Sequence, residues 1–244
     1  MKQPEGFNDG TGPVCRLKRS LYGLKQAPRC WNKRFGDFLR QHEFKQNEAD
    51  PCIFMRCRGN EKVIIALWVD DGIAAATSEA ESKQLITELK SEFKIEAKDA
   101  SYFLGLEINT QQDGSIKVCQ EGYTKRILER FGMAECRPTP TPAVKESGKA
   151  VLTDEKSNPV NSEVRDFDNE PFSYRSAVGA LLYLATGTRP DIAQAVGLVS
   201  RNLEKPSHED FIKVKRIFRY LKGTTDYGLV YRPEHKPGVI AKLQ

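Results

Sequence analysis

A short apolar run that ends in two carboxylates is the strongest constraint on how this chain folds. Val63–Val69 is apolar throughout and is followed by Asp70, Asp71, Gly72 and a second apolar stretch, Ile73–Ala76. The first run is far shorter than the ~20 residues that span a bilayer, and its β-branched and aromatic residues favour a strand. Asp-Gly is a favoured hairpin turn. The sequence therefore predicts an antiparallel hairpin that turns at Asp71-Gly72, and no membrane segment.

The composition of the 244-residue chain is that of a globular protein. Its 39% hydrophobic and 29% charged residues are typical of one large or two small domains. Its six cysteines form no CxxC pair, so neither a zinc site nor a disulfide framework is indicated. The polar start, MKQPEGF, has no signal-peptide character. These features predict an intracellular protein in a reducing compartment, cytoplasmic or nuclear.

Apolar periodicity and start signals predict the remaining elements. They predict helices after Pro28, over Glu79–Phe93 and around Tyr123–Phe131, and a second hairpin of Tyr102–Asn109 with Ser115–Gln120. Cap residues predict three further helices, which follow Ser173, Pro190 and Ser207, the last with Asp210 as a capping box. Between them, residues 137–171 hold five prolines and few large apolar residues, which predicts a linker or a long surface loop. The fold class expected is α+β.

The positive charge is concentrated in two stretches. The net charge is only +5, but residues 16–40 hold eight Lys or Arg against one acid, Asp37. Residues 211–223 hold five more and no acid. A solvated helix face explains part of this excess, and a groove for a nucleic-acid backbone explains the rest. Within the first stretch, Trp31, Phe35 and Phe38 recur at helical spacing, which favours a core role over base stacking.

The adjacent carboxylates Asp70 and Asp71 are the best candidates for chemistry. Two carboxylates held close together repel unless they are protonated or bridged by a cation, and Mg²⁺ is the cation that prefers oxygen ligands. The plain alternative is an ordinary Asp-Gly turn with one additional aspartate. Periodicity alone favours the ordinary turn.

Five ordered motifs resemble a known family. They are SLYGLKQAPRCW at 20–31, LWVDDGIAA at 67–75, YFLGLEI at 102–108, YRSAVGALLYLATGTRPDIAQAV at 174–196 and KRIFRYLKGTTDYGL at 215–229. In wording, order and spacing they resemble the reverse transcriptase of copia-type LTR retrotransposons. The resemblance covers nearly the whole chain, from about Met1 to Tyr231.

The resemblance implies a right-hand polymerase fold. It implies a palm with partial fingers over residues 1–118, a palm–thumb connection over 119–136, the linker at 137–171, a helical thumb over 172–223 and a connection over 224–244 toward an RNase H domain. The implied reaction is two-metal nucleotidyl transfer to a primer 3′-hydroxyl. The implied partners are an RNA or DNA template with its primer and dNTPs, and the oligomeric state stays open.

The resemblance also implies roles for particular residues. Asp70 and Asp71 match the aspartates that are catalytic and bind Mg²⁺. Nucleotide and template contacts match Tyr22, Gly23, Lys25, Gln26 and Pro28. Primer contacts match Trp68 and the hairpin of Phe103, Leu104, Gly105, Leu106 and Glu107. The thumb surface that grips the nucleic-acid backbone matches Lys213, Lys215, Arg216 and Arg219.

Three departures from the family pattern lower the activity expected of this chain. The family's first catalytic aspartate, in a DVxxAFLxG context, has no match here, because Asp9 lies in a Gly-rich turn and Asp50 precedes Pro51. Trp68 stands where the family usually has tyrosine, and no RNase H carboxylates follow. The expectation is a fragment that is inactive alone. The alternatives are a catalytically silent module that binds template and primer, and a non-functional retrotransposon relic.

Overall fold

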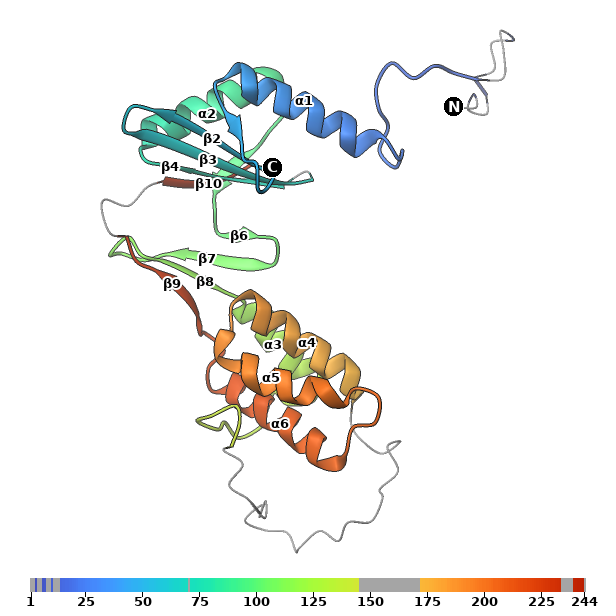
Figure 1. The fold of residues 1–244 in the computed structure, drawn as a ribbon, viewed down its shortest axis with the longest axis vertical. Helices are drawn as coiled ribbons and strands as arrows, with labels where there is room; N and C mark the ends of the chain where they lie inside the picture. The colour runs from blue at the N-terminus through green and yellow to red at the C-terminus, as the bar shows by residue number, and fades with distance from the viewer. Residues whose placement is uncertain are drawn as a thin grey trace, which may run out of the picture. The chain divides into compact units, whose positions relative to one another are not determined.

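The computed structural model describes residues 14–69, 71–144 and 172–233, the backbone of 239–243, and the isolated residues Gln3, Gly6, Phe7 and Gly10. The chain divides into two compact units (Figure 1). The first unit holds Met1–Ala100 with Gly238–Gln244, and the second holds Ser101–Pro237. Each unit has its own hydrophobic core.

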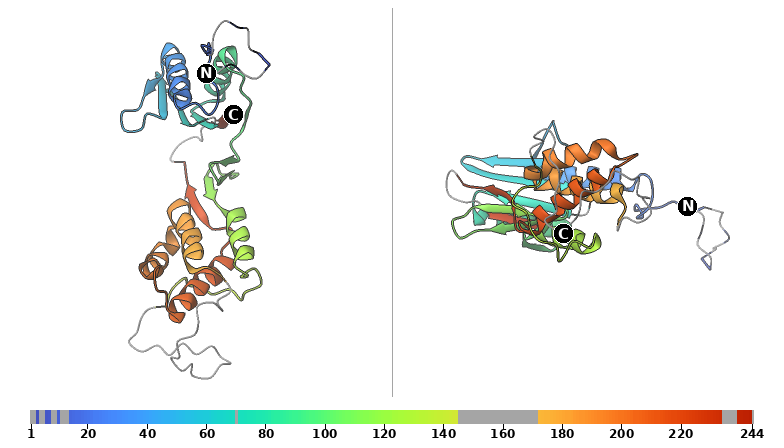
Figure 2. Two further views of the ribbon diagram at one scale, coloured as in Figure 1. Left: turned by 90° about the vertical axis from the view of Figure 1, so that its right-hand side faces the viewer. Right: turned by 90° about the horizontal axis from the view of Figure 1, so that it is seen from below.

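The first unit is an antiparallel sheet with two helices on one face (Figures 1 and 2). The strand order is β1-β2-β3-β4-β10-β5. The strands are β1 Lys45–Gln46, β2 Ile53–Arg58, β3 Glu61–Trp68, β4 Asp71–Ala76, β5 Ala97–Asp99 and β10 Val239–Leu243. The helices are α1 Ala27–Gln41 and α2 Glu79–Glu92.

The pleat of this sheet separates a buried face from an open one. Phe54, Val63 and Ile65 are fully buried and pack with Leu39 of α1 and Leu89 of α2. Successive side chains of a strand point to opposite faces, so the even-numbered residues of β3 and the odd-numbered residues of β4 share the open face. Trp68 and Asp71 are register partners on that face.

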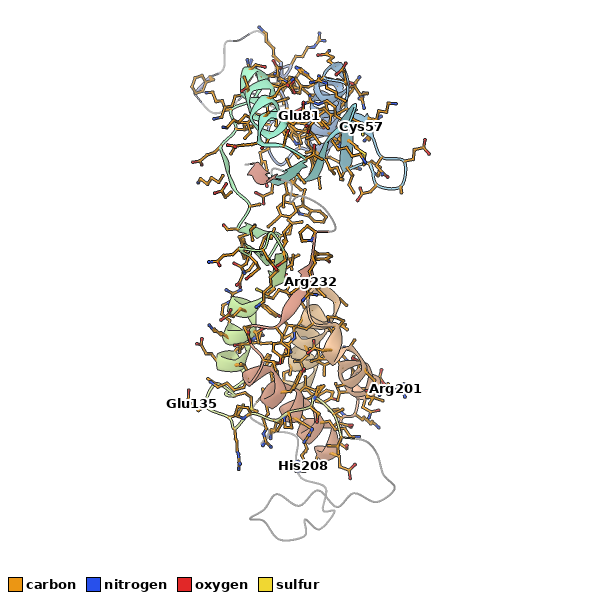
Figure 3. All side chains as sticks on the ribbon, turned by 90° about the vertical axis from the view of Figure 1, so that its left-hand side faces the viewer. Cys57, Glu81, Glu135, Arg201, His208 and Arg232 are labelled. Atoms are coloured by element: carbon orange, nitrogen blue, oxygen red, sulfur yellow. The ribbon has the colours of Figure 1, made fainter. Side chains whose placement is uncertain are left out.

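Arg56 fastens β2 to α2 from the buried face. Its side chain is only 1% exposed and forms ion pairs with Glu81, at 3.1 Å, and Glu88, at 2.7 Å. Figure 3 labels Glu81 of α2 and Cys57 of β2, the residue that follows Arg56 in the sequence. The guanidinium also lies 4.6 Å from the ring centroid of Phe44. A buried arginine is tolerated only when its charge is paired. The two carboxylates that pair with Arg56 lie on one face of α2.

The second unit combines a four-stranded antiparallel sheet with a helical bundle (Figure 1). The strand order is β6-β7-β8-β9. The strands are β6 Tyr102–Phe103, β7 Leu106–Thr110, β8 Ile116–Cys119 and β9 Gly228–Tyr231. The helices are α3 Glu121–Arg130, α4 Tyr174–Gly187, α5 Ala193–Val199 between the 3₁₀ turns η2 Pro190–Ile192 and η3 Ser200–Asn202, and α6 His208–Lys222.

A buried arginine also organises the second unit. Arg189, 1% exposed, donates from Nε and Nη2 to the carboxylate of Asp191 at 2.9 and 2.8 Å. Its Nη1 and Nη2 donate to the main-chain oxygen and the hydroxyl of Thr224, each at 2.7 Å. The hydroxyl of Tyr220 donates to the same Asp191 carboxylate at 2.8 Å. The TRPDI part of the fourth motif therefore joins the end of α4 to the end of α6.

The helices agree well with the sequence predictions, and so does the α+β class. The helices after Pro28, at 79–93 and at 123–131 are confirmed as α1, α2 and α3, and the three later helices are confirmed as α4, α5 with its 3₁₀ ends, and α6. The predicted capping box is present, because Ser207 and Asp210 bond reciprocally. None of the described helices is long and apolar enough to cross a membrane.

Two strand predictions are wrong in detail. The first hairpin does not turn at Asp71-Gly72: Trp68 pairs with Asp71, so both residues of that dipeptide lie within β4. The segment Tyr102–Asn109 is not one strand, because Leu104 and Gly105 reverse the chain between β6 and β7. Positive φ at both turn residues, 50° and 85°, is typical of a two-residue hairpin turn.

Several strands have no counterpart in the sequence analysis. They are β1, β2, β5, β9 and β10. β2 was missed because Arg56 and Arg58 interrupt its apolar pattern. β10 pairs with β4 and β5, a partnership that joins segments far apart in the chain. Of the expected linker, residues 137–144 are described and lie along α6, while 145–171 fall outside the described residues.

Candidate nucleic-acid and metal site

The β3–β4 hairpin presents Asp71 at its tip. Asp71 is the first residue of β4, is half-buried and lies on the open face beside its register partner Trp68, which is 61% exposed. Val69 has φ 53°, a left-handed conformation that is rare for a β-branched residue. Backbone strain of this kind persists only where neighbouring structure holds it, and it is often found at functional sites. Asp70, the other predicted catalytic residue, lies outside the described residues.

Trp31 of α1 holds this turn directly. Its indole Nε1 donates a hydrogen bond to the main-chain oxygen of Val69 at 3.0 Å. The indole ring also contacts Phe35 and Phe93, with centroid separations of 5.4 and 5.5 Å. Phe35 and Phe38 are core residues, as the sequence predicted, but Trp31 is partly exposed at 38%. Trp31 therefore links the first motif to the carboxylate hairpin, a contact that spacing alone did not predict.

The predicted nucleotide-binding segment enters α1 through two successive turns. Leu24 N bonds to Leu21 O at 3.3 Å, and Ala27 N bonds to Leu24 O at 3.0 Å. Gly23, with φ 89°, supplies the positive φ that the first of these turns needs. All five predicted residues of this segment are exposed: Tyr22, at 95%, and Gly23, Lys25, Gln26 and Pro28.

The described residues alone do not complete a metal site. Among them, no group of three His, Cys, Asp or Glu is placed to hold one ion. Asp71 supplies a single carboxylate with no partner among the described side chains. Among the described residues, the oxygen donors for Mg²⁺ at the hairpin tip are therefore those of one carboxylate, Asp71.

The predicted primer-binding hairpin, β6–β7, packs against α4. A Cβ placed on Gly105 would lie 2.6 Å from the hydroxyl oxygen of Tyr183, so the glycine permits a close approach as well as the turn. Tyr183 also makes an edge contact with Tyr123 of α3, at 4.9 Å between centroids. Leu104 at the tip is 42% exposed and Tyr183 is 44% exposed. The hairpin tip and α4 thus form one partly aromatic surface, and sequence reasoning missed the contribution of Tyr183.

Phe103, Leu106 and Glu107 flank this tip and are not strongly exposed. The carboxylate of Glu107 accepts a hydrogen bond from Gly122 N, in the first turn of α3, at 2.7 Å. Negative charge near a helix N-terminus is stabilised by the unpaired N–H groups and the helix dipole. Glu107 therefore has a structural partner, which was not expected from its predicted primer contact.

The predicted backbone-gripping residues lie on α6, and two of them hold a neighbouring segment. Arg219 Nε donates to Arg137 O at 2.8 Å, and Arg216 Nη2 donates to Thr141 Oγ1 at 2.9 Å. We call residues 137–144 the strap. Lys213 is exposed and Lys215 is half-buried on the same helix. The strap therefore occupies part of the basic surface that the sequence assigned to nucleic acid.

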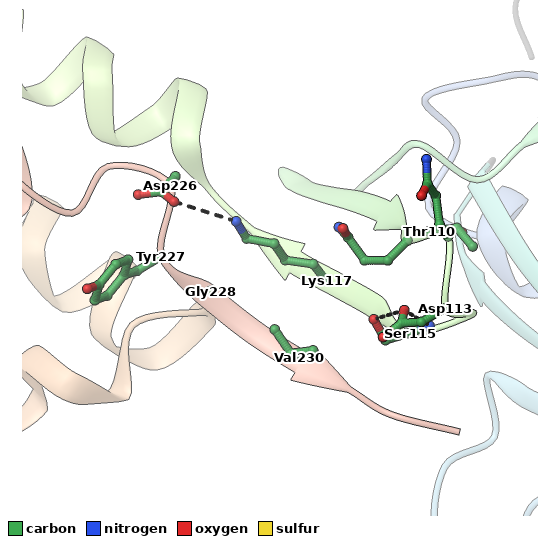
Figure 4. A pocket seen from close by; sticks show the side chains of 10 residues that line it. Thr110, Asp113, Ser115, Lys117, Asp226, Tyr227, Gly228 and Val230 are labelled. Carbon is green, nitrogen blue, oxygen red and sulfur yellow. Dashed lines mark hydrogen bonds and ion pairs between the residues drawn. The ribbon is translucent and has the colours of Figure 1, made fainter. Parts of the chain in front are cut away.

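A pocket of about 740 Å³ in the second unit contains none of the predicted site residues (Figure 4). It lies beside β7, β8 and β9, and its charged side chains have partners. Lys117 Nζ forms an ion pair with Asp226 Oδ2 at 3.9 Å, and the carboxylate of Asp113 accepts a hydrogen bond from the hydroxyl of Ser115. The predicted residues instead fall into two sets. Those at 22–28 and 68–71 belong to the first unit, and those at 103–107 and 213–219 belong to the second.

Comparison with known proteins identifies the family. Residues 1–145 match the family model described as reverse transcriptase (RNA-dependent DNA polymerase). The chain belongs to this reverse transcriptase family. It is 39% identical over 234 residues to a retrovirus-related Pol polyprotein from transposon TNT 1-94 of Nicotiana tabacum, covering 92% of this chain and 17% of the relative. It is 34% identical over 232 residues to the Pol polyprotein from transposon RE2 of Arabidopsis thaliana, which covers 94% of this chain and 15% of that polyprotein.

A shorter relative supports the same assignment. The putative transposon Ty5-1 protein of Saccharomyces cerevisiae is 31% identical over 237 residues, which cover 95% of this chain and 73% of that protein. The chain spans about a sixth of the length of the Pol polyproteins from TNT 1-94 and RE2. A search of the solved structures found no match.

Proposed function

We propose that this chain is the palm and thumb part of an RNA-directed DNA polymerase. The observation that carries the proposal is the hydrogen bond from Trp31 to the turn of the β3–β4 hairpin. It fastens two of the family motifs together, so that the helix following the exposed segment 22–28 is anchored at Val69, two residues before Asp71. The proposed partners are a template with its primer and dNTPs.

In the proposed site, residues of the first unit have three roles: metal binding, base stacking and nucleotide contact. Asp70 and Asp71 would hold Mg²⁺, which in this chemistry activates the primer 3′-hydroxyl and stabilises the leaving pyrophosphate. The exposed ring of Trp68, across the hairpin from Asp71, offers a stacking surface next to the primer end. Tyr22 and Lys25 are exposed and free to meet a nucleotide and its phosphates.

The second unit is proposed to hold the primer and the duplex. The β6–β7 hairpin, with Gly105 at its tip, is the proposed primer grip, and α4–α6 form the proposed thumb. Phosphate contacts from basic side chains dominate the affinity for nucleic acid, and α6 carries Lys213, Lys215, Arg216 and Arg219. The palm over 1–118 and the thumb over 172–223 remain the proposed boundaries.

We further propose that the isolated 244-residue chain extends primers poorly. Two-metal transfer uses carboxylates that clamp both ions, and the described residues supply Asp71 without a third ligand beside it. Loss of a metal carboxylate costs several powers of ten in rate. The second candidate function is therefore a catalytically silent module that binds template and primer.

Primer extension on poly(rA)/oligo(dT) with Mg²⁺ tests these alternatives. The variants are Asp70→Asn and Asp71→Asn, and the matched control is Asp99→Asn, which removes the same charge from an exposed position on β5 of the same sheet. Extension that both site variants abolish and the control retains would support an active polymerase. Salt-dependent binding without extension would support the silent module. A chain that neither extends a primer nor binds one would refute both functions.

A further inference from the structure

The strap combines two threonine-proline dipeptides with arginines of α6. Its sequence, Arg137-Pro138-Thr139-Pro140-Thr141-Pro142, places a proline directly after each threonine. A following proline disfavours the helical conformation and favours an extended one, so the sequence favours an extended backbone at Thr139 and Thr141. Thr141 is exposed and Thr139 is half-buried. Extended backbone is the conformation that protein kinases require of the acceptor segment.

Three hydrogen bonds fix the strap on α6. Thr139 N donates to Arg219 O at 3.2 Å, Arg219 Nε donates to Arg137 O at 2.8 Å, and Arg216 Nη2 donates to Thr141 Oγ1 at 2.9 Å. A Cβ placed on Gly223 would lie 3.1 Å from the ring of Pro138, so the start of the strap also packs closely on the end of α6. The hydroxyl of Thr141 is therefore held at a defined distance from a guanidinium.

The guanidinium of Arg216 has one unused hydrogen-bond donor beside Thr141. Its Nε is buried and has no hydrogen-bond partner among the described residues. Nε and Nη2 share one edge of the planar group, and this edge binds phosphate through two parallel hydrogen bonds. At present Nη2 meets the single oxygen of the Thr141 hydroxyl. Phosphate oxygens on that hydroxyl would give the same edge two acceptors and satisfy the unpartnered donor.

The charges around the strap favour an anion. Burial raises the pKa of the Cys136 thiol, and the positive charges of Arg219 and Lys222 act in the opposite direction at that position. Glu135 is the acid that opposes them there. Arg216 adds its own charge at the other end of the strap. The phosphate of phosphothreonine carries about −1.5 to −2 charges at neutral pH, which complements this surface.

From this geometry we infer that Thr141 is the acceptor of a proline-directed protein kinase and that Arg216 binds the resulting phosphate. In that reaction the Thr141 Oγ attacks the γ-phosphorus of ATP, the bond to ADP breaks, and the hydroxyl proton passes to the base of the kinase. The phosphorylated strap is then held on α6 by an ion pair between the guanidinium and the phosphate, in place of a hydrogen bond from the guanidinium to a neutral hydroxyl. This inference concerns the strap and shares Arg216 with the surface proposed to grip nucleic acid, but it does not depend on polymerase activity.

Phosphorylation of the full chain is the first test. The chain is incubated with ATP and a purified proline-directed kinase, and the products are mapped by mass spectrometry. We expect one phosphate on Thr141, which Thr141→Ala abolishes and the matched control Thr139→Ala retains. Phosphate on Thr139 alone, or on neither threonine, would overturn the inference.

Titration of the phosphate by ³¹P NMR is the second test, because a merely structural strap would not affect it. A neighbouring guanidinium favours the dianion, so the pKa of phospho-Thr141 should lie about one unit lower in the wild type than in Arg216→Gln. Arg216→Lys keeps the charge but loses the bidentate edge and should give an intermediate value. The exposed Arg201 provides the control Arg201→Gln, which should leave the pKa unchanged. Equal pKa values in the wild type and in a folded Arg216→Gln variant would refute phosphate binding by Arg216.

Discussion

Replacing Arg189 by methionine is expected to destabilise the second unit selectively. Methionine keeps much of the apolar stem but removes every donor. The carboxylate of Asp191 then loses its ion pair and keeps only the hydrogen bond from Tyr220, and the main-chain oxygen of Thr224 loses one of its two donors. Removing one partner of a fully buried ion pair costs about 3–5 kcal/mol, and because the Asp191 side chain is 33% exposed, we expect a cost near or below the lower limit of that range. A domain is stable by only about 5–15 kcal/mol, so the loss is a large part of the total.

Urea unfolding of this variant can be followed separately in the two units. Both tryptophans, Trp31 and Trp68, lie in the first unit, so their fluorescence reports that unit alone, while far-UV circular dichroism reports helices of both. We expect Arg189→Met to lower the urea concentration at which the dichroism of helices α3–α6 is lost, and to leave the midpoint of the fluorescence transition unchanged. Arg189→Lys keeps the positive charge but loses the planar set of guanidinium donors, so it should lower the unfolding free energy less than Arg189→Met.

The control is Arg201→Met, which removes an exposed arginine of the same unit and should change stability by less than about 0.5 kcal/mol. The reasoning is refuted if Arg189→Met unfolds within that margin of the wild type. It is also refuted if the fluorescence transition shifts as far as the dichroism transition, because the effect would then not belong to the second unit.

Three further perturbations test other parts of the second unit. Gly105→Ala should cost about 1–2 kcal/mol, because φ 85° strains an L-residue and the new methyl group meets Tyr183; Tyr183→Phe in the same chain should recover part of this loss in a thermal melt. Ser207→Ala should lower the unfolding free energy by about 1 kcal/mol through loss of the capping box, measured by urea titration. Burial alone would raise the pKa values of Asp191 and Asp210, but hydrogen bonds and nearby positive charge outweigh it and lower both. The stabilisation from these two carboxylates is therefore fully present above the unfolded pKa of about 3.9 and is lost as pH falls through the lower folded pKa values. We expect the urea concentration at the unfolding midpoint to decrease as the pH is lowered below about 4, and to decrease less in Asp191→Asn.

Sequence reasoning predicted the features that depend on neighbouring residues. Helix starts at Ser173 and Ser207 follow from the hydrogen-bonding capacity of a hydroxyl toward the first helical N–H groups, and both caps are present. The β3–β4 hairpin was predicted from two apolar runs separated by polar residues, although its turn lies before Asp71 and not at Asp71-Gly72. The motifs that mark the reverse transcriptase family are likewise local strings, and comparison with known proteins agreed with them.

Only the tertiary structure decided which distant residues meet. Arg56 and Arg189 resemble any other arginine in the sequence, yet both are buried because partners from distant segments meet them. These partners are Glu81 and Glu88 of α2 for Arg56, and Thr224 after α6 for Arg189. Trp31 fits a core position by its spacing, but its bond to Val69 crosses 38 residues. Arg216 fits a nucleic-acid contact by its charge, and the fold places it against Thr141. Spacing along a chain predicts the face on which a side chain lies, whereas its hydrogen-bond partner depends on how separate elements pack, and this packing is determined by the whole core.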